Sequence, residues 1–572
     1  MKILLLAHSF NGLTQRLFVD LREAGYQVSV ELDIHDEITA EAVTLFQPDL
    51  LIAPFLKRRI PETIWRQLPC LILHPGPPGD RGPSALDWAL LKQEKLWGVT
   101  LLEANATLDG GDIWGFETFP MRNTTKGVLY HQEVTDAASR ITLNVVRQFE
   151  TGSISPHPQN ALPDAERWGE QLLMSQQDRK IDWQQDSQES VLRKINSADG
   201  SPGLLDSLFG HSLYLYDAQP EKQLSGSPGE IIARSGPALC RATADGKGVW
   251  IGHLRDRQST HPFKLPATQL LADELNKHPS LEEVHYSPAM QSGYREIVYE
   301  EENSVGLIHF NFYNGAMSTA RCQQLQQTLQ QAKQRSTRAI LLLGGENYWS
   351  NGMCLNQIEA AQSPADASWE NINAMDDLAL EILQSDHHLI ISAVQGNAAA
   401  GGLFLARTAD LIWARKGVIL NPHYKDMGNL YGSEYWSYLL PKHAGIEHAQ
   451  QISQARLPMG TEEAHRLGLV DQQFDCPHDS FLNTCKSEVD KLIHQPDFDQ
   501  QLKQKRQQRR TDEQIRPLAR YREAELEKMR LNFYGFDPSY HIARYNFVHK
   551  VAKSRTPTTI AFHRRPQRTA QS

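Results

Sequence analysis

A histidine and an aspartate in the first quarter of the chain are of the types that move protons. His74 directly follows the apolar run Cys70–Leu73, and Asp109 comes thirty-five residues later in an Asp-Gly-Gly-Asp turn. Histidine titrates near neutral pH, so its ring can carry a proton to a leaving group and donate a hydrogen bond to an oxyanion. A carboxylate beside the ring would orient it and stabilise its charged form. Each residue alone is equally compatible with an ordinary loop, because Asp-Gly is common turn chemistry.

Two glycine-containing turns in the second half of the chain could bind an oxyanion through backbone N–H groups. They are Tyr348–Met353 and Gln395–Gly402. Backbone donors at such turns suit a developing enolate or acyl anion. The alternative is purely structural, since glycine also permits close packing where a strand leads into a helix.

The segments around His74 require a sheet that brings strand ends together. Within residues 1–150, short apolar runs alternate with helical patterns, which predicts a mostly parallel sheet covered by helices. The predicted strands are Ile3–Ala7, Tyr26–Leu32, Leu50–Ala53 and Cys70–Leu73, and Gly12–Ala24 is a predicted helix. Ligands bind beyond the carboxyl ends of the strands in such sheets. His74 and Pro54–Lys57 both follow apolar runs, so we expect them to face one cleft.

Changes in composition divide the rest of the chain. Ser153–Asp164 is rich in Pro, Ser and Asn and is a predicted linker, and residues 181–265 contain short strands broken by glycine, which predicts a small, OB-like β-barrel. A second α/β unit begins with two strands in Glu296–Phe310, followed by a helix over Thr319–Gln334 and a buried strand over Ala339–Gly344. We therefore expect an α/β multidomain protein. Its predicted parts are 1–155, 165–270, a linker over 271–295, 296–500, and a C-terminal helical extension with a tail over 501–572.

Two features of the C-terminal extension lead to separate expectations. Lys503–Arg530 carries ten basic and five acidic residues at helical spacing, and we favour a solvated helix face over a binding patch. The last twenty or so residues lack acids and strong periodicity, which predicts a loose tail.

The overall composition excludes several classes of protein. With 22% charged residues and a net charge of −10 over 572 residues, the chain is an ordinary globular protein without nucleic acid as its main partner. Its six cysteines form no Cys-x-x-Cys pair, so neither a zinc site nor a disulfide framework is indicated. No apolar run approaches the ~18–20 residues that span a bilayer. We expect a cytoplasmic protein without a membrane or metal partner.

Taken together, the N-terminal motifs resemble the folate-dependent formyltransferases, such as methionyl-tRNA formyltransferase. The matching segments are Leu71–Gly76, Asp80–Pro83, Gly98–Thr100, Leu108–Ile113, Lys180–Trp183 and Ser201–Gly203, and the resemblance covers residues 1–260. It implies N10-formyltetrahydrofolate as formyl donor and His74 and Asp109 as catalytic residues. It also implies that Pro54, Phe55, Leu56 and Lys57 bind the pterin. Gln15 and Arg16 follow the first strand, and from this position we expect them to reach the cofactor or the acceptor.

One residue departs from the formyltransferase pattern. Ile72 stands where the family has an asparagine, and its side chain can donate no hydrogen bond. Loss of one oxyanion donor typically costs ~2.7–4 kcal/mol of transition-state stabilisation. Formyl transfer at this site is therefore slow, or another hydrogen-bond donor stabilises the oxyanion, or the formyl group goes to a more nucleophilic acceptor such as a thiolate.

The C-terminal motifs resemble the enoyl-CoA hydratase/isomerase (crotonase) superfamily. Besides the two glycine turns, the matching segments are Arg407–Asp410, Leu457–Thr461 and Ala464–Asp471, and the resemblance covers residues 296–475. It implies coenzyme A as a cofactor and an oxyanion hole made by the N–H groups of Met353 and Gly401. Ser350 and Gly402, in the same turns, are candidate CoA-binding residues.

The two glutamates of the hydratases are missing from this chain. They align near Phe404 and at His423/Tyr424, so hydration of a double bond is not expected. Tyr424 and Glu434 lie nearby in the alignment and are candidate acid–base replacements. Ser433 is a predicted N-cap, which would place Glu434 in the first turn of a helix. The structural alternatives are that the tyrosine packs and the glutamate caps.

A formyltransferase followed by an altered crotonase resembles the HypX (HoxX) family of nickel–iron hydrogenase maturation factors. The resemblance implies that the formyl group becomes the CO ligand of the hydrogenase iron. Our hypothesis is formyl transfer to the thiol of CoA, then decarbonylation of formyl-CoA to CO and CoA. Hydrogenase maturation proteins are then possible recipients of the CO. Two alternatives stay open: formylation of an amine acceptor, and a non-catalytic scaffold for hydrogenase assembly.

Overall fold

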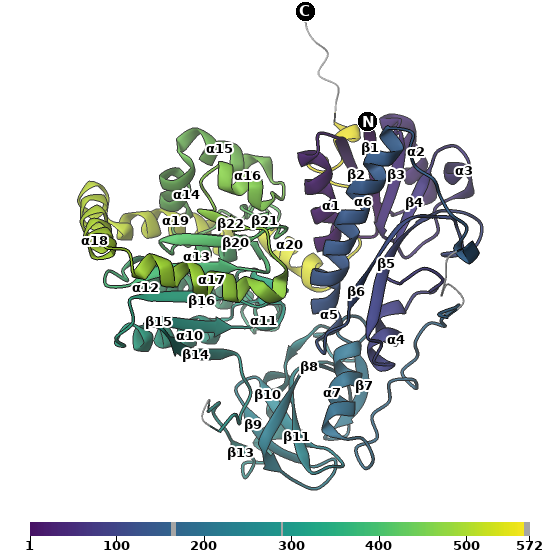
Figure 1. Ribbon diagram of the computed structural model, residues 1–572. Helices are drawn as coiled ribbons and strands as arrows, with labels where there is room; N and C mark the ends of the chain where they lie inside the picture. Colours follow the sequence, from purple (N-terminus) through teal and green to yellow (C-terminus); the bar gives the residue numbers. More distant parts are fainter. Residues whose placement is uncertain (162–166, 288–289, 566–572) are drawn as a thin grey trace, which may run out of the picture.

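The computed structural model describes residues 1–161, 167–287 and 290–565. Figure 1 shows three sheet-containing parts: an N-terminal part, a smaller part below it, and a third part beside both. The predicted linkers Ser153–Asp164 and 271–295 and the predicted tail each include residues outside the described ranges. Within those ranges, no helix is long and apolar enough to cross a membrane.

The N-terminal part is built on a six-stranded sheet in the order β2-β1-β3-β4-β5-β6. The first four strands in that order are parallel, as predicted, whereas β5 and β6 run antiparallel to their neighbours. Ile3 and Leu5 pack toward α1 and α6, whereas Leu4 and Leu6 pack toward α2 and α3, so helices cover both faces. The bounds are β1 (Lys2–Ala7), α1 (Gly12–Glu23), β2 (Gln27–Leu32), α2 (Asp36–Phe46), β3 (Leu50–Phe55), α3 (Glu62–Trp65), β4 (Cys70–His74), α4 (Ala85–Leu91), β5 (Leu96–Glu103), β6 (Ile113–Pro120), α5 (Lys126–Leu129) and α6 (Thr135–Glu150).

A π-helical segment, η1 (Tyr130–Val134), joins α5 to α6. One extra residue in a helical turn redirects the side chains there, and such segments are frequent at functional sites. Here the segment faces the third part of the molecule, as described below.

The second part contains a seven-stranded, mostly antiparallel sheet covered by α7. Its main path is β13-β9-β10-β11-β8-β7, and β12 pairs with β11. The predicted run of short strands over residues 181–265 is confirmed, although β8 is long. The bounds are η2 (Gln159–Ala161), α7 (Gln188–Ser197), β7 (Leu204–Leu208), β8 (His211–Ser225), β9 (Ile231–Ser235), β10 (Ala238–Ala242), β11 (Lys247–Arg255), β12 (Leu265–Pro266), α8 (Ala267–Leu270), α9 (Ala272–Asn276) and β13 (Glu282–Glu283).

The third part has a six-stranded sheet, β14-β15-β16-β18-β20-β22, and a small sheet, β17-β19-β21. Each strand of the small sheet follows a strand of the large one, so the chain repeatedly leaves the large sheet through a short strand before it forms a helix or loop. That repetition gathers the two glycine turns and the loop after β21 in one place. The bounds are β14 (Ile297–Glu302), β15 (Val305–Phe310), η3 (Tyr313–Gly315), α10 (Thr319–Ala332), β16 (Ala339–Leu343), β17 (Tyr348–Ser350), α11 (Leu355–Glu359), α12 (Pro364–Leu383), β18 (Leu389–Val394), β19 (Asn397–Ala399), α13 (Gly401–Arg407), β20 (Leu411–Arg415), β21 (Leu420–Asn421), α14 (Trp436–Ala444), α15 (Ile446–Ala455), α16 (Thr461–Arg466), β22 (Gln472–Phe474) and α17 (His478–Ile493).

The basic C-terminal segment forms two helices, α18 (Phe498–Ile515) and α19 (Leu518–Tyr534), which are separated at Pro517. Only Phe498 of α18 is buried, which agrees with a solvated helix. Helix α19 differs, because it buries Leu518, Glu525, Met529 and Phe533 against the third part. A third helix, α20 (Ser539–Val548), follows.

The expectation of a loose tail is wrong for the described residues after α20. Figure 1 shows this yellow segment, with the short η4 (Phe562–Arg564), beside the first strands of the chain. The backbone of Ile560 accepts a hydrogen bond from Val30 N at 3.1 Å. Glu31 is completely buried and receives hydrogen bonds from Thr556, His563 and Arg564. Burial raises the pKa of Glu31, but these donors outweigh it and lower the pKa overall.

Substitution of Glu31 is expected to release this docked segment. Glu31→Ala removes a buried charge partner, which typically costs about 3–5 kcal/mol. Hydrogen exchange in a peptide covering residues 27–32 should therefore speed up by about a hundredfold or more, because Val30 and Leu32 donate their N–H groups to the segment. The control is Glu41→Ala, an exposed partner of Arg564, for which little change is expected. Unchanged exchange in Glu31→Ala would contradict the stabilising role of this contact.

Candidate active sites

His74 ends strand β4 and is held between two carboxylates. Its Nε2 lies 2.7 Å from Asp80 Oδ2, and its Nδ1 lies 3.7 Å from Asp109 Oδ2. All three side chains are buried. The sequence prediction paired His74 with Asp109, and the structure brings these residues together. The sequence prediction did not assign a role to Asp80, which lies closer to the His74 ring than Asp109 does. Asp80 begins the Asp-Arg-Gly-Pro segment, six residues after His74.

Glycine at position 76 makes the His74–Asp80 contact possible. A side-chain carbon on Gly76 would lie 2.3 Å from Asp80 Oδ2 and 2.6 Å from His74 Nε2, so larger residues do not fit. Thr100 Oγ1 donates a hydrogen bond to Gly76 O at 2.8 Å and fixes this turn. The N–H of Gly82 donates to Asp109 Oδ2 at 3.2 Å, which holds the second carboxylate near the ring.

The first site also leaves one polar atom without a protein partner. Asp80 Oδ1 is buried and accepts no hydrogen bond from any described residue. Buried polar atoms are normally satisfied, so this oxygen fits a hydrogen-bond donor on a bound substrate. Ile72, two residues before His74 on the same face of β4, lies in a hydrophobic cluster and offers no such donor.

The predicted pterin-binding segment lies at the same edge of the sheet. Strand β3, which ends at Phe55, is the parallel neighbour of β4, so Pro54–Lys57 and His74 lie at the same end of adjacent strands. Pro54 is buried and Lys57 is exposed. The carbonyl of Phe55 accepts a hydrogen bond from His8 N at 2.7 Å, which ties this segment to the end of β1. Pterin binding there stays a prediction.

Gln15 occupies a different place, at the boundary between the two halves of the chain. Its Nε2 donates to Phe10 O at 2.9 Å, and its Oε1 accepts from Asn421 Nδ2 of the third part at 3.0 Å. Arg16 likewise donates to Gly417 O at 2.5 Å. Both side chains therefore connect the halves, and binding of the cofactor or acceptor by Gln15 stays a prediction.

In the second site, Tyr424 and Glu434 form a buried pair. Tyr424 Oη donates to Glu434 Oε2 at 2.7 Å, and the phenol ring stacks on Phe404 with ring centres 5.4 Å apart. Burial raises the pKa of Glu434 to about 8, and the negative charge of Asp376 adds to the effect. Burial and the Glu434 carboxylate also raise the pKa of Tyr424 well above its usual value, so the phenol stays protonated. The sequence prediction named both residues, and the structure shows that they touch.

The Glu434 carboxylate lies directly against the predicted oxyanion hole. A side-chain carbon on Gly401 would lie only 2.2 Å from Glu434 Oε1. One on Gly352 would lie 3.4 Å from Gly401 N, which shows that the two glycine turns adjoin. Among the described residues, the N–H groups of Met353 and Gly401 donate to no protein atom. They are therefore available to a ligand oxygen.

Ser350 and Gly402 contact each other and support these turns. Ser350 is fully buried, and its Oγ accepts a hydrogen bond from Gly352 N at 3.1 Å. A side-chain carbon on Gly402 would lie 2.3 Å from Ser350 O. Both residues thus position the oxyanion-hole backbone, and direct CoA binding by either stays a prediction.

The expectation that Ser433 caps a helix is wrong. Helix α14 begins at Trp436, and Glu434 and Tyr435 precede it with left-handed φ values of 56° and 60°. The side chain of Ser433 instead donates to Asp376 Oδ2 at 2.8 Å. Two buried carboxylates, Asp376 and Glu525, bind this backbone in place of a cap. Sequence patterns could not reveal them, because they come from α12 and α19, far away along the chain.

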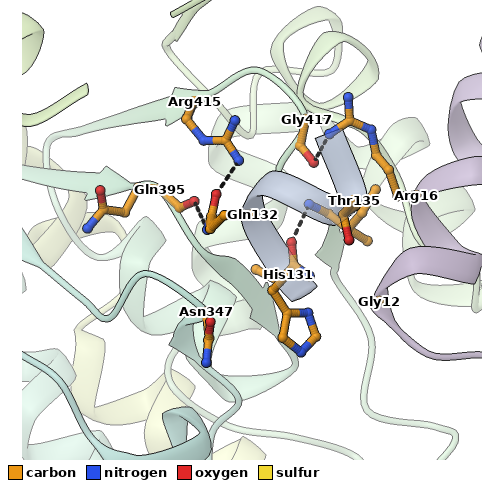
Figure 2. Close-up of a pocket in the computed structure, with 11 residues that line it drawn as sticks. Gly12, Arg16, His131, Gln132, Thr135, Asn347, Gln395, Arg415 and Gly417 are labelled. Atoms are coloured by element: carbon orange, nitrogen blue, oxygen red, sulfur yellow. Dashed lines mark hydrogen bonds between the residues drawn. The ribbon is translucent and has the colours of Figure 1, made fainter. Parts of the chain in front are cut away.

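The π-helical segment η1 forms a polar junction with the third part. Figure 2 shows His131 and Gln132 facing residues of the second half around a small cavity. Arg415 Nη2 donates to Gln132 Oε1 at 2.7 Å, and the Tyr348 hydroxyl lies 3.1 Å from His131 Nε2. Burial lowers the pKa of His131 to about 4, so its ring is neutral. The halves thus meet through buried hydrogen bonds that no sequence motif indicated.

Known proteins match both halves of the chain. A family model described as formyl transferase, C-terminal domain, matches residues 173–262, and one described as enoyl-CoA hydratase/isomerase matches residues 300–533. Methionyl-tRNA formyltransferase of Syntrophus aciditrophicus is 25% identical over 219 residues, which cover 37% of this chain and 69% of that protein.

Two further proteins match the whole chain. The hydrogenase maturation factor HoxX of Bradyrhizobium diazoefficiens is 52% identical over 564 residues, which cover 99% of this chain and 97% of that protein. The crystal structure of HypX from Aquifex aeolicus in complex with tetrahydrofolic acid superimposes with a TM-score of 0.95 and 47% identity, and the match covers 99% of each chain. The two expected parts and their order are thereby confirmed. The chain belongs to the HypX/HoxX family of hydrogenase maturation factors.

Proposed function

We propose that this protein makes CO for hydrogenase maturation from N10-formyltetrahydrofolate, with coenzyme A as the carrier of the formyl group. The observation that carries the proposal is the buried Tyr424–Glu434 pair, whose carboxylate lies against the backbone of Gly401. A hydratase needs acids that act on a double bond and water. Here one acid–base pair lies beside the N–H groups of Met353 and Gly401, which donate to no atom of the described residues. This arrangement suits proton removal from a bound carbonyl carbon.

The first step is formyl transfer at the N-terminal site. His74 takes the proton of the CoA thiol, and the sulfur forms the new bond to the formyl carbon. The bond between the formyl carbon and the folate nitrogen then breaks, and His74 gives the proton to that nitrogen. Asp80 and Asp109 stabilise the charged ring, since both lie against it. Ile72 removes one oxyanion donor, and a thiolate compensates because it is a stronger nucleophile at neutral pH than a protonated amine.

The second step is decarbonylation of formyl-CoA at the C-terminal site. The N–H groups of Met353 and Gly401 bind the formyl oxygen, and Glu434 Oε1 takes the formyl proton. The C–S bond breaks with its electron pair on sulfur, Tyr424 Oη protonates the thiolate, and CO leaves. The protonated Glu434 carboxyl group then turns and returns this proton to Tyr424 Oη, which lies 2.7 Å from Oε2 in the structure, and the pair is restored. Nothing is oxidised or reduced, and CoA is regenerated.

The raised pKa of Glu434 suits a base in this step. With a pKa of about 8, the ionised form is a strong enough base to take a proton and is still populated near neutral pH. Because only the ionised form accepts the proton, the decarbonylation rate should rise as the pH increases toward 8.

A CO-trapping haemoprotein tests the proposal with the purified full-length protein. CO should form only when N10-formyltetrahydrofolate and CoA are both present, and CoA should act in less than stoichiometric amounts. Supplied formyl-CoA should release CO without folate. A formylated amine without CO would favour formylation of an amine acceptor, and no turnover of either substrate would favour an assembly scaffold. Either result would contradict the proposal.

A further inference from the structure

The backbone that carries Glu434 is held in a conformation that side-chain-bearing residues rarely adopt. In the turn formed by residues 432–437, Glu434 and Tyr435 have φ values of 56° and 60°, and Gly432 has 89°. Left-handed backbone at residues other than glycine persists only where the surroundings enforce it, and it is concentrated at functional sites. The surroundings of this turn therefore decide where the Glu434 carboxylate points.

Two buried carboxylates from distant helices bind the turn. Asp376 of α12 accepts from Glu434 N at 2.8 Å through Oδ1 and from Ser433 Oγ at 2.8 Å through Oδ2. Glu525 of α19 accepts from Tyr435 N at 3.0 Å through Oε2 and from Ser437 N at 2.8 Å through Oε1. Both carboxylates are almost completely buried.

The chemistry of these contacts requires carboxylates. Both oxygens of Asp376 and both oxygens of Glu525 accept hydrogen bonds, and an ionised carboxylate is a pure acceptor. An asparagine or glutamine would place an N–H₂ group against a backbone N–H, so one bond would be lost and two donors would face each other. Burying two acids next to a third costs free energy. We therefore expect Asp376 and Glu525 to have a specific role in this part of the molecule.

We propose that Asp376 and Glu525 are positioning residues for Glu434, and that they hold the 432–437 turn so that its carboxylate meets Tyr424 and the Gly401 backbone. This inference rests on the proposed function, in which Glu434 is the base. It also assigns a task to the C-terminal extension, because Glu525 comes from α19. Met529 of the same helix contributes as well, since its sulfur accepts from Gly432 N at 3.1 Å.

The same two acids influence the proton affinity of Glu434. Burial raises the pKa of Glu525 to about 8 and that of Asp376 to about 6, and each group adds negative charge near Glu434 when it is ionised. Arg522 carries a positive charge next to one of these acids, with its Nε 3.7 Å from Asp376 Oδ2. The titratable and charged groups around Glu434 are Tyr424, Cys322, Asp376, Arg522 and Glu525. Neutralising either neighbouring acid removes a like charge and lowers the pKa of Glu434.

Asp376→Asn and Glu525→Gln test the inference in the full-length protein with formyl-CoA as substrate. Each should lower the rate constant for CO release by about tenfold or more, because a buried hydrogen bond to a charged group is lost. Each should also move the rising limb of the pH profile to lower pH, by about one unit. A purely structural role would not move that limb. Glu525→Asp, which keeps the charge, should leave the limb in place.

Exposed acids on the same helices provide matched controls. Glu370→Gln on α12 and Glu523→Gln on α19 should change neither the rate constant nor the pH limb. If an amide variant does not fold, Met529→Leu is measured instead: it removes only the thioether acceptor, and a roughly threefold loss of rate constant is expected. An unmoved limb in Asp376→Asn and Glu525→Gln, or an unchanged rate constant in Met529→Leu, would overturn the inference.

An infrared titration separates failure of this inference from failure of the proposed function. The protonated Glu434 carboxyl is identified as the C=O band that disappears in Glu434→Gln, and its titration is followed without substrate. If Glu434→Gln still released CO, the proposed function would fail. The band would still show whether Asp376→Asn and Glu525→Gln shift the titration of Glu434, and no shift would refute the positioning role by itself.

Discussion

Glu434→Gln is expected to lower CO release from formyl-CoA by about 10²- to 10⁴-fold, the usual contribution of a positioned general base. Glutamine has nearly the same shape as glutamate, but it cannot accept the formyl proton. The residue is buried beside Gly401, where it is shielded from solvent. CO is measured by haemoprotein trapping after addition of formyl-CoA, and Tyr424→Phe should reduce the same rate because it removes the proton donor to sulfur.

Formyl transfer serves as the internal control for this variant. Glu434→Gln should still release tetrahydrofolate from N10-formyltetrahydrofolate in the presence of CoA, because the N-terminal site is intact. Glu447→Gln, an exposed glutamate on α15, is the matched surface control and should behave like the unmodified protein. Normal CO release by Glu434→Gln would assign the base to another group and remove the main support for the proposed second step.

His74→Ala is expected to impair formyl transfer and to spare CO release from formyl-CoA, the reverse of Glu434→Gln. Loss of the ring removes the proton donor to the folate nitrogen, so formyl transfer should fall by about 10²- to 10⁴-fold. CO should then be lost with N10-formyltetrahydrofolate but retained with supplied formyl-CoA. Asp80→Asn should have a larger effect than Asp109→Asn, because Asp80 lies 2.7 Å from the ring and Asp109 lies 3.7 Å from it. Tetrahydrofolate release and CO trapping measure the two steps separately.

An exposed histidine gives the matched control for the first site. His494→Ala, at the end of α17, should alter neither step. If His74→Ala lost CO release from formyl-CoA as well, the two sites would not be independent, and the assignment of formyl transfer alone to His74 would be refuted.

Local sequence patterns predicted the elements well wherever their periodicity was strong. The apolar runs at Ile3–Ala7 and Cys70–Leu73 form buried strands in the parallel part of the N-terminal sheet, and the carboxyl end of β4 places His74 at the candidate site. For the described residues after α20, the prediction of a loose tail was wrong. Its lack of acids was interpreted as a sign of disorder, but it provides the basic and hydroxyl groups that satisfy buried Glu31 in β2. Complementary charges more than 500 residues apart leave no local pattern.

The sequence by itself determined the types of residue that the proposed chemistry needs and the order of the two halves, because residue type and spacing along a strand or turn are local properties. Both glycine turns and the His74, Asp109, Tyr424 and Glu434 side chains could be named from it. Only the tertiary structure decided which groups touch. Asp80 lies closer to His74 than Asp109 does, because Gly76 has no side chain between them. In the second site, Asp376 of α12 and Glu525 of α19 bind the turn that carries Glu434. Such contacts depend on packing and on the need of buried charges for partners, and they depend only weakly on distance along the chain.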